Sequence, residues 1–387
     1  MARVFDDLEV QYFKEVLQSG KLGWHHGGMV TRFEEAFAQL VGSQYAVARN
    51  ANMTALAQAV SISGAGTATE VICDPIVHFG GLATLSFNAV PRFADVKYGT
   101  FNMDPESLRA NITPQTRAVI VTNLWGLCAE LDEIRKICDE HGIFMIEDCA
   151  HVIGSYWKGK HAGTYGDVGI FSFQQGKHLP TGDGGMMTTN RKDLYDKIYG
   201  EWAFSGESPA FLTLNYRMNE ATGAIGLAQV QRVLGYVEQY TRSLLILNEA
   251  IDGCAWLKPR DVCADAKQSG YVWACIWEGD KHGLDYGRFK QLCKDLDLRI
   301  NFGFNRLDTP NYTYDIFKVS TAYGVADCPV RCPFYTAKSD YRYHPGLCPV
   351  AEDLIPRLVR SGLVEAAPDE VARRAQGLRE AIRRMEG

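Results

Sequence analysis

VGIFSFQQGKHLPTGDGGMMTTN, residues 168–190, is the stretch around which the chain is organised. Its apolar run from Val168 to Phe173 is typical of a buried strand, and Met186 to Thr189 of a second, shorter one. Between them lie a lone lysine, Lys177, and the turn G-D-G-G at 182–185. Such a lysine has two interpretations: a solvated loop residue, or a lysine bonded covalently to a cofactor. The rest of the sequence is needed to choose between these two interpretations of Lys177.

Strand-like runs alternate with helix-like runs from about residue 30 to residue 200. We expect strands at 45–48, 70–77, 91–96, 117–126 and 143–151. We expect helices at 53–64, 80–89, 104–112 and 131–142, with Asp104 and Gly142 as helix start and stop signals. The alternation predicts an α/β fold whose mostly parallel sheet is flanked by helices. Ligands bind such sheets at the carboxyl ends of the strands.

The chain of 387 residues is long enough for two domains. We expect a cofactor-binding large domain over residues 1–245, with an N-terminal helix able to pack on the second domain. Residues 246–387 are expected to form a smaller α+β C-terminal domain, because their strands are aromatic and alternating, as in YVWACIW. The stretch from Met218 to Ile251 resembles one long helix that links the two.

The composition is that of an ordinary globular protein, with 46% apolar residues and a net charge of -6. That charge argues against nucleic-acid and anionic-membrane partners. No run reaches the roughly 18 apolar residues of a membrane span, and the N-terminus resembles a first helix rather than a signal peptide. A cytoplasmic location is expected. The eleven cysteines include no C-x-x-C pair, and Cys328 and Cys332 lack the partners of a metal site, so no metal is expected.

Several further side chains stand where a site would form. Asp148 ends the strand IFMIED, where it would either cap the next segment or pair with a pyridinium nitrogen. Phe79 follows another strand end and would either pack in the core or stack on a planar cofactor. Ser172 and Gln174 flank the strand before Lys177 and add hydroxyl and amide groups. The turn from Arg49 to Ala55 opens a helix, whose free N–H groups suit a phosphate.

The order of these parts resembles a specific family. D-P-x-x-x-F ends at residue 79, E-D-C-A-H spans 147–151 and F-S-F-Q-Q-G-K-H-L-P-T-G-D-G-G spans 171–185. N-Y-R-M-N-E-A-T-G-A-I-G-L-A-Q at 215–229 closes the series. Together they resemble the DegT/DnrJ/EryC1/StrS family of sugar aminotransferases, which have fold type I and use pyridoxal 5'-phosphate (PLP). The resemblance is good over residues 15–245 and weaker beyond.

The resemblance implies a role for each position. Lys177 would form a Schiff base with PLP and shuttle the proton of the substrate. Asp148 would pair with the ring nitrogen, His151 would contact the phenolic oxygen, and Phe79 would stack on the ring. Ser172, with Asn52, Met53 and Thr54, would hold the phosphate, and Gln174 would add an amide. Asn215 or Arg217 would reach the phosphate site of a neighbouring subunit, which requires a homodimer.

The sequence departs from the family at three places. The phosphate turn has Asn52-Met53-Thr54 where the family has a Gly and a Thr, so the phosphate contacts can differ. The strand at 117–126 ends in N-L-W-G, with Asn123 where a His is common. The family's L-P-L-H-P before the last helix is absent, which suggests an unusual substrate pocket.

The resemblance implies an aminotransferase that moves an amino group from glutamine or glutamate to a ketone. The acceptor would be a sugar, a nucleotide-linked sugar or a cyclitol, in amino-sugar or antibiotic biosynthesis. The Q-Q-G-K run also resembles that of aminohydroxybenzoate synthases, which leaves aminodehydration and aromatisation as an alternative. A sugar dehydratase is a second alternative, although those relatives carry His at the lysine position. The third is a PLP-binding regulator with a degenerate site.

Overall fold

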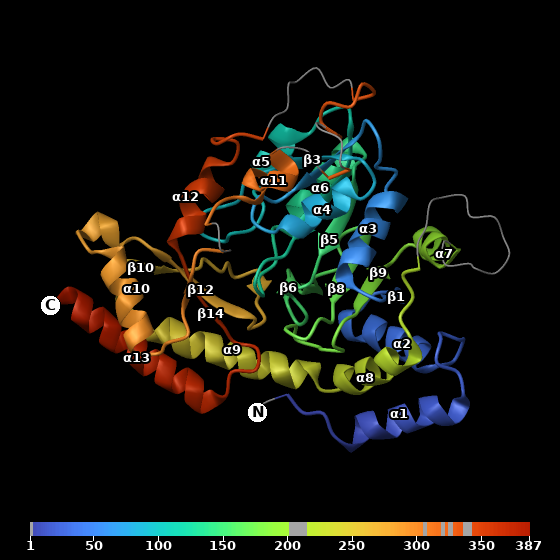
Figure 1. Ribbon diagram of the computed structural model, residues 1–387, viewed down its shortest axis with the longest axis horizontal. Coiled ribbons are helices and arrows are strands. Elements are labelled where there is room, and N and C mark those ends of the chain that lie inside the picture. Colours follow the sequence, from blue (N-terminus) through green and yellow to red (C-terminus); the bar gives the residue numbers. More distant parts are fainter. Residues whose placement is uncertain (1–2, 201–214, 305–307, 319–321, 324–327, 336–342) are drawn as a thin grey trace.

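A seven-stranded sheet forms the centre of the molecule (Figure 1). The computed structural model describes residues 3–200, 215–304, 308–318, 322–323, 328–335 and 343–387. In chain order the strands of this sheet are β1 (Tyr45–Arg49), β2 (Glu70–Cys73), β3 (Val90–Phe93), β4 (Thr116–Thr122), β5 (Phe144–Asp148), β8 (Val168–Ser172) and β9 (Gly185–Thr189). Their spatial order is β1-β9-β8-β5-β4-β2-β3.

The sheet is parallel from β3 to β8, as the sequence predicts. Strand β9 is antiparallel to both of its neighbours, β8 and β1. The loop between β8 and β9 contains no crossover helix and folds back on itself through the Gln175–Gly182 and Thr181–Phe173 hydrogen bonds, so β9 returns beside β8 in the antiparallel direction. The glycine-rich turn that carries Lys177 therefore also sets the direction of β9.

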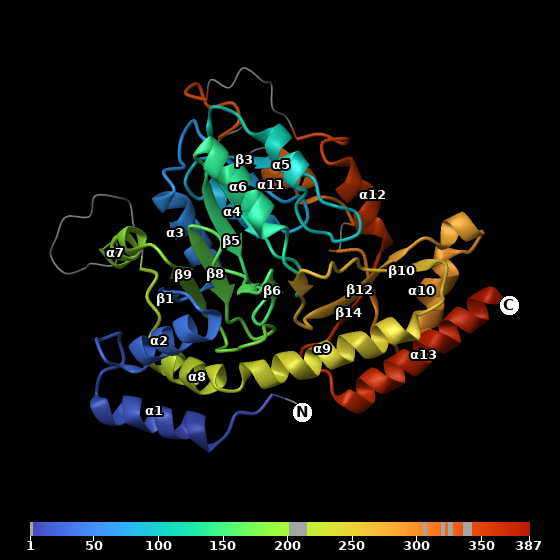
Figure 2. The ribbon, with the colours of Figure 1, turned by 180° about the vertical axis from the view of Figure 1, so that it is seen from behind.

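Helices cover both faces of the sheet (Figures 1 and 2). The helices of this part are α1 (Asp7–Ser19), α2 (Met29–Val41), α3 (Asn52–Ile62), α4 (His78–Leu85), α5 (Pro105–Asn111), α6 (Leu131–His141), α7 (Lys192–Gly200) and α8 (Glu220–Val230). One buried cluster joins the sheet to α2, α6 and α8, and a second joins its other face to α3 and α4. Helix α1 packs on α8.

Local sequence signals explain where these helices begin and end. Asp6 and Glu9 form a capping box at the start of α1, and the Asp104 carboxylate accepts a hydrogen bond from the Glu106 N–H at the start of α5. Gly142 ends α6 in the left-handed conformation at φ 64°. The signals at Asp104 and Gly142 thus act as the sequence predicts.

The stretch expected to form one long helix is two helices. Helix α8 ends at Val230, and α9 (Val233–Ala250) begins after a short break at Gln231 and Arg232. Apolar periodicity continues across the break, which explains why the sequence did not reveal it. The helix expected at 80–89 starts two residues earlier, at His78, and ends at Leu85. The strand expected at 70–77 ends at Cys73, before Pro75.

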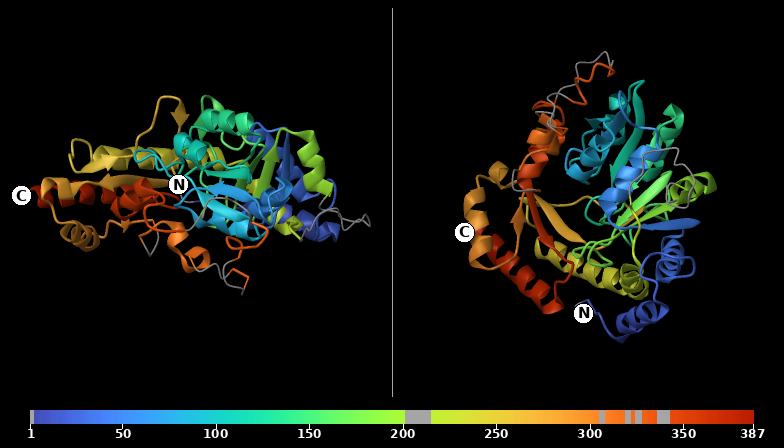
Figure 3. Two further views of the ribbon diagram at one scale, coloured as in Figure 1. Left: turned by 90° about the horizontal axis from the view of Figure 1, so that it is seen from above. Right: turned by 45° about the vertical axis from the view of Figure 1, so that its right-hand side comes forward.

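A second, four-stranded antiparallel sheet follows α9 in the order β10-β12-β14-β13. Its strands are β10 (Leu257–Pro259), β12 (Val272–Trp277), β13 (Asn301–Phe302) and β14 (Leu358–Gly362). A third buried cluster, rich in tryptophan, joins it to α9, α10 (Tyr286–Asp295) and α13 (Pro368–Glu386). Figure 3 shows α13 and this sheet beside the central sheet, with α9 running along both.

The remaining elements are short. They are β6 (Tyr156–Trp157), β7 (Lys160–His161), β11 (Ala266–Lys267), α11 (Asp315–Lys318), α12 (Pro349–Arg357) and the 3-10 turns at Gly279–His282 and Asn311–Thr313. Strands β11, β6 and β7 form a small sheet of their own. The eleven cysteines are free thiols. Within the described residues no helix is long and apolar enough to span a membrane, and no cluster of potential metal ligands occurs.

Candidate active site

Lys177 lies in the loop that joins β8 to β9, residues 173–184, which we call the lysine loop. The Gln175 N–H donates to the Gly182 carbonyl at 2.8 Å, and the Lys177 N–H donates to the Gln174 carbonyl at 2.9 Å. Gly182 has φ +90°, which glycine adopts without strain. A Cβ at Gly185 would come within 2.7 Å of the Ala51 carbonyl group, so a side chain there would displace the neighbouring turn. The loop is therefore held in one shape by its own hydrogen bonds and glycines.

A cavity of about 400 Å³ lies at the carboxyl ends of β5 and β8 and includes Lys177. Eight of the eleven residues expected from the sequence line it: Lys177, Asp148, His151, Phe79, Ser172, Met53, Asn52 and Gln174. The others that line it are Ala51, Val77, Ala150, Asp183 and Gly184. The structure thus gathers residues from four separate parts of the sequence at the edge of the sheet where ligands bind.

Asp148 ends β5 with only 2% of its surface exposed. Its carboxylate accepts a hydrogen bond from the Ala150 N–H at 3.1 Å and lies 3.5 Å from the Asn52 amide nitrogen. Burial raises the pKa of this carboxyl group, while the Ala150 N–H and the positive charge of Lys177 act in the opposite direction. The site therefore holds a buried carboxylate whose charged form a positively charged ligand group would stabilise.

The ammonium group of Lys177 is poorly solvated. Burial lowers the pKa of Lys177 to about 8, and the charge of Asp148 only partly offsets this. The Nζ atom also lies 5.3 Å from the centre of the Tyr271 ring. An amine with this pKa is neutral in a useful fraction of molecules near neutral pH, as a nucleophile or proton carrier requires. The position of Lys177 in this cavity favours a cofactor-bound lysine over a solvated loop residue.

His151 stacks on Tyr271, with ring centres 4.6 Å apart and an interplanar angle of 19°. Burial lowers the pKa of His151 well below its usual value, so the ring is neutral. Its Nδ1 atom is buried and has no hydrogen-bond partner within the described part of the chain. A buried imidazole nitrogen without a hydrogen-bond partner costs folding free energy unless a ligand in the cavity supplies the missing partner.

Tyr271 was not foreseen from the sequence. It precedes β12 and reaches the site from the smaller sheet, where its ring also lies 5.2 Å from that of His178. In the sequence it is the first residue of the aromatic run YVWACIW, and nothing in that run marks it as functional. Only the packing of the two sheets brings it to Lys177.

The turn before α3 offers backbone N–H groups. Ala51 is the N-cap of α3 and supplies no side-chain hydrogen bond to the helix. The first N–H groups of the helix therefore remain available at the cavity, where Asn52 and Met53 lie. Thr54 does not line the cavity, because its hydroxyl group lies 2.7 Å from the Asn50 side-chain oxygen and 2.8 Å from the Ala51 carbonyl oxygen. It stabilises the turn and does not face the cavity.

Asn215 and Arg217 lie beside this turn but outside the cavity lining. The Asn50 amide group donates to the Asn215 carbonyl at 3.1 Å, and the Arg217 Nε donates to the Asn215 side-chain oxygen at 3.1 Å. Both side chains are exposed. Within one chain they therefore support the outside of the phosphate turn.

Phe79 lies at the start of α4 and lines the cavity. Its exposed fraction is 43%, so it is not a core residue. The ring of His78 packs against it at 4.3 Å. An exposed aromatic ring at a cavity mouth is suited to stacking on a flat ligand.

These groups fit PLP. The cavity combines a lysine of lowered pKa, a buried carboxylate, an exposed aromatic ring and the N-terminus of a helix. The unpaired His151 Nδ1 and the uncapped N–H groups of α3 both lack partners that PLP supplies through its phenolic oxygen and its phosphate.

Residues 4–359 match the sequence model of the DegT/DnrJ/EryC1/StrS aminotransferase family. The spore coat polysaccharide biosynthesis protein SpsC of Bacillus subtilis is 29% identical over 360 residues, which is 88% of this chain and 90% of that one. The GDP-perosamine synthase of Caulobacter vibrioides is 36% identical over 54% of this chain and 57% of its own. The L-glutamine:2-deoxy-scyllo-inosose aminotransferase of Streptomyces kanamyceticus is 37% identical over 41% of this chain and 37% of its own.

A solved structure shares the fold. The aminotransferase from Psychrobacter cryohalolentis superposes with a TM-score of 0.84 over 100% of this chain and 99% of its own, at 22% identity. At this identity the likeness concerns the fold, and it covers both sheets described above.

Proposed function

Because this chain belongs to the DegT/DnrJ/EryC1/StrS aminotransferase family, whose members depend on PLP, we propose that it aminates a ketone on a sugar, a nucleotide-linked sugar or a cyclitol. The amino group would come from glutamine or glutamate. The observation that carries the proposal is the buried Lys177, set in one cavity with Asp148 and His151.

PLP, when bound, supplies a ring that spreads the negative charge left on a carbon when that carbon loses its proton. In our proposal Lys177 holds the cofactor covalently and then moves the proton at its Nζ atom, for which a pKa of about 8 is well matched. The Asp148 carboxylate keeps the ring nitrogen protonated. Asp148 has few other partners, so this ion pair can form without breaking an existing one.

Three groups would orient the cofactor. The neutral His151 ring would use its unpaired Nδ1 for the phenolic oxygen. Phe79 would cover one face of the cofactor, because its ring is exposed to the cavity. The N–H groups of Asn52 and Met53, with the Ser172 hydroxyl, would hold the phosphate at the positive end of α3.

We also propose a cytoplasmic homodimer. Asn215 and Arg217 are held at the surface next to the phosphate turn, where a second subunit could share them. A mass in solution of twice that of one chain is the expected result of sedimentation analysis.

Two observations support an amino-sugar or cyclitol product. The relatives include a GDP-perosamine synthase and a glutamine:inosose aminotransferase, each matching only part of its length. The rim of the cavity carries Gln174 and Asp183, both exposed, whose polar atoms suit the hydroxyl groups of a polyol.

The half-reaction tests this proposal. The PLP-loaded protein is mixed separately with glutamine, glutamate and alanine, and the absorbance of the lysine-bound cofactor is followed. We expect its loss with glutamine or glutamate, and its return when a keto sugar or keto-cyclitol is added.

The Lys177→Ala variant should show no such band, whereas Lys192→Ala, which removes an exposed lysine paired with Asp196, should behave as the wild type. Failure of every amino acid to consume the band would contradict the proposal.

A further inference from the structure

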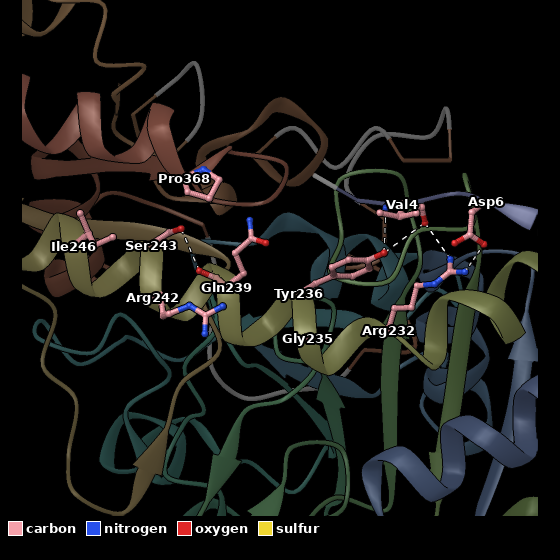
Figure 4. Close-up of a pocket in the computed structure, with 10 residues that line it drawn as sticks. All are labelled: Val4, Asp6, Arg232, Gly235, Tyr236, Gln239, Arg242, Ser243, Ile246 and Pro368. Carbon is pink, nitrogen blue, oxygen red and sulfur yellow. Dashed lines mark hydrogen bonds and ion pairs between the residues drawn. The ribbon is translucent and has the colours of Figure 1, made fainter. Parts of the chain in front are cut away.

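The N-terminal strap, residues 3–6, is fastened to helices α8 and α9 (Figure 4). The Val4 N–H donates to the Tyr236 hydroxyl at 3.1 Å, and the Val4 carbonyl accepts from Gln229 at 2.8 Å and from Arg232 at 3.1 Å. Arg232 also pairs with Asp6 at 2.6 Å. These contacts hold the strap through the backbone of Val4 and the side chain of Asp6.

A cavity lies beside the strap and α9. Val4 and Asp6 border a cavity of about 580 Å³ that extends along α9 to Pro368 (Figure 4). This cavity is larger than the one around Lys177 but contains none of the residues expected to act in the reaction. The strap lacks tight packing beside this cavity. The position of the strap therefore depends on its polar contacts to α8 and α9.

Arg3 points from the strap into the loop that carries Lys177. Only 3% of its side chain is exposed. Its guanidinium group donates to the backbone carbonyls of Gln175 and Lys177. The same group pairs with the Glu365 carboxylate at 3.0 Å. A buried arginine thus joins two carbonyls of the lysine loop to a residue between β14 and α13.

Glu365 closes the connection from the other side. Its carboxylate also accepts a hydrogen bond from the Gln175 side chain at 3.3 Å. Arg3 and Gln175 therefore converge on one acidic side chain, and that side chain belongs to the segment that follows the smaller sheet. The lysine loop is thus tied to the N-terminal strap and to the segment between β14 and α13.

We propose that Arg3 is a positioning residue of the active site, which fixes the lysine loop through the carbonyls of Gln175 and Lys177. The inference rests on the role proposed for Lys177. Hydrogen bonds from a charged donor are about twice as strong as neutral ones, and the planar guanidinium group fixes two acceptors at once. A fixed Lys177 carbonyl limits the rotation that would carry the side chain out of its buried position.

The positive charge of Arg3 also reaches the rings around Lys177. It acts on Tyr271, where it opposes the raised pKa of about 12 that burial causes. It also contributes, after burial, to the lowered pKa of His178, which is about 3. Loss of Arg3 would admit water to the lysine loop, and better solvation of the ammonium group raises the pKa of Lys177, because burial is what lowers it.

Hydrogen exchange of the cofactor-free protein tests the proposal without any reaction. In Arg3→Ala we expect the Gln175 and Lys177 amides to exchange about tenfold faster, because two charge-assisted bonds that restrain the loop are lost. Tyr236→Phe, which loosens the strap but leaves Arg3 in place, should give a smaller increase at the same amides. Arg3→Lys keeps one donor and should restore part of the protection.

Arg135→Ala is the matched control. Arg135 joins the Ile143 carbonyl to the Asp167 carboxylate, at the opposite end of β5 from Asp148. It should leave exchange of the lysine loop unchanged. The second readout is the pH dependence of covalent PLP capture, whose midpoint should move upward from about 8 in Arg3→Ala only. Unchanged exchange and an unchanged midpoint in a folded Arg3→Ala protein would overturn the proposal, and so would equal changes in Arg135→Ala.

A failure of the proposed function can be distinguished from a failure of the role proposed for Arg3. If PLP were never captured, the exchange experiment would still show whether Arg3 restrains the loop. Faster exchange without PLP capture would leave Arg3 as the restraint of the loop and would refute the role given to Lys177.

Discussion

Burial lowers the pKa of Lys177. The side chain sits in a cavity whose walls come from β5, β8 and the turn before α3, and the single carboxylate of Asp148 only partly compensates for lost water. A lysine that kept its ordinary pKa of 10.5 would be neutral in about one molecule in a thousand at about pH 7.5. With a pKa of about 8, roughly a quarter of the molecules carry the neutral amine. In the proposed reaction this neutral fraction serves as the nucleophile without a separate base.

This difference predicts how PLP capture depends on pH. The neutral amine is the reactive form and exists above the pKa, so capture by the cofactor-free protein should accelerate through about pH 8 and level off above it. Asp148→Asn removes the charge that favours the ammonium form, so its midpoint should lie lower. Stopped-flow absorbance over a pH series measures both midpoints. A wild-type midpoint near the ordinary value of 10.5 would contradict the buried environment described for Lys177.

Residues such as Lys177, Asp148, His151 and Phe79 could be predicted from the sequence because each lies at a strand end or a turn with a recognisable motif. Thr54 was also predicted to hold the phosphate, but it does not line the cavity. Asn215 and Arg217 lie beside the turn and outside the cavity of their own chain, and their contact with a neighbouring subunit stays a prediction. Motif spacing places a residue near the site, but the local hydrogen bond of a hydroxyl decides which way it faces. Tyr271 and Arg3 carry no motif, and only tertiary packing brings them to Lys177.

At the scale of the elements, glycine allows α8 to approach its neighbours. A Cβ at Gly226 would lie 2.4 Å from the Phe33 ring of α2, and one at Gly223 would lie 2.7 Å from the Val30 backbone. Helix α2 therefore lies so close to α8 at Gly223 and Gly226 that a Cβ atom has no room at either position. This close contact belongs to the buried cluster that supports β8, and thereby the lysine loop.

The contact predicts opposite effects for two glycine substitutions. Gly226→Ala should lower the free energy of unfolding by about 1–3 kcal/mol, because the new methyl group has no room beside Phe33. Gly235→Ala in α9 meets nothing within 4 Å, so it should raise that free energy by up to about 1 kcal/mol through better helix propensity. Urea denaturation of the two variants compares them. Equal destabilisation would show that packing at Gly226 is not the cause.

The elements also show where sequence patterns fail. The starts and ends at Asp104 and Gly142 were foreseen because capping is a local interaction. The break between α8 and α9 was not, because the apolar pattern continues through Gln231 and Arg232. Arg232 leaves the helical path at a point where its side chain pairs with Asp6 and Glu9 of the N-terminal segment. That contact is long-range and leaves no mark in the sequence.

At the scale of the whole molecule, the surroundings of Lys177 come from both sheets. The central sheet supplies Asp148 and the lysine loop, and Tyr271, which precedes β12 of the smaller sheet, contacts His151 and Lys177. We propose a division of the chain into a cofactor-binding part, residues 1–245, and a smaller part, residues 246–387. The separate tryptophan-rich cluster of the smaller sheet supports this division, although that cluster also includes Tyr236, Tyr240 and Leu244 of α9.

The parallel sheet and the family could be predicted from the sequence, because both depend on patterns that repeat or cluster along the chain. The reversal of β9, the contribution of Tyr271 and the strap at Arg3 depend on the packing of distant segments. The family match confirms the aminotransferase fold and chemistry, while the acceptor ketone stays a proposal. The sequence departs from its family at the phosphate turn, and there Asn52 approaches Asp148.

The most direct test of the central claim is the position of the cofactor bond. The PLP-loaded protein is reduced with borohydride, digested and mapped by mass spectrometry. The account predicts that the added mass is found on the peptide that contains Lys177 and is absent from Lys177→Ala. Labelling of another lysine, or a protein that takes up no PLP, would contradict it.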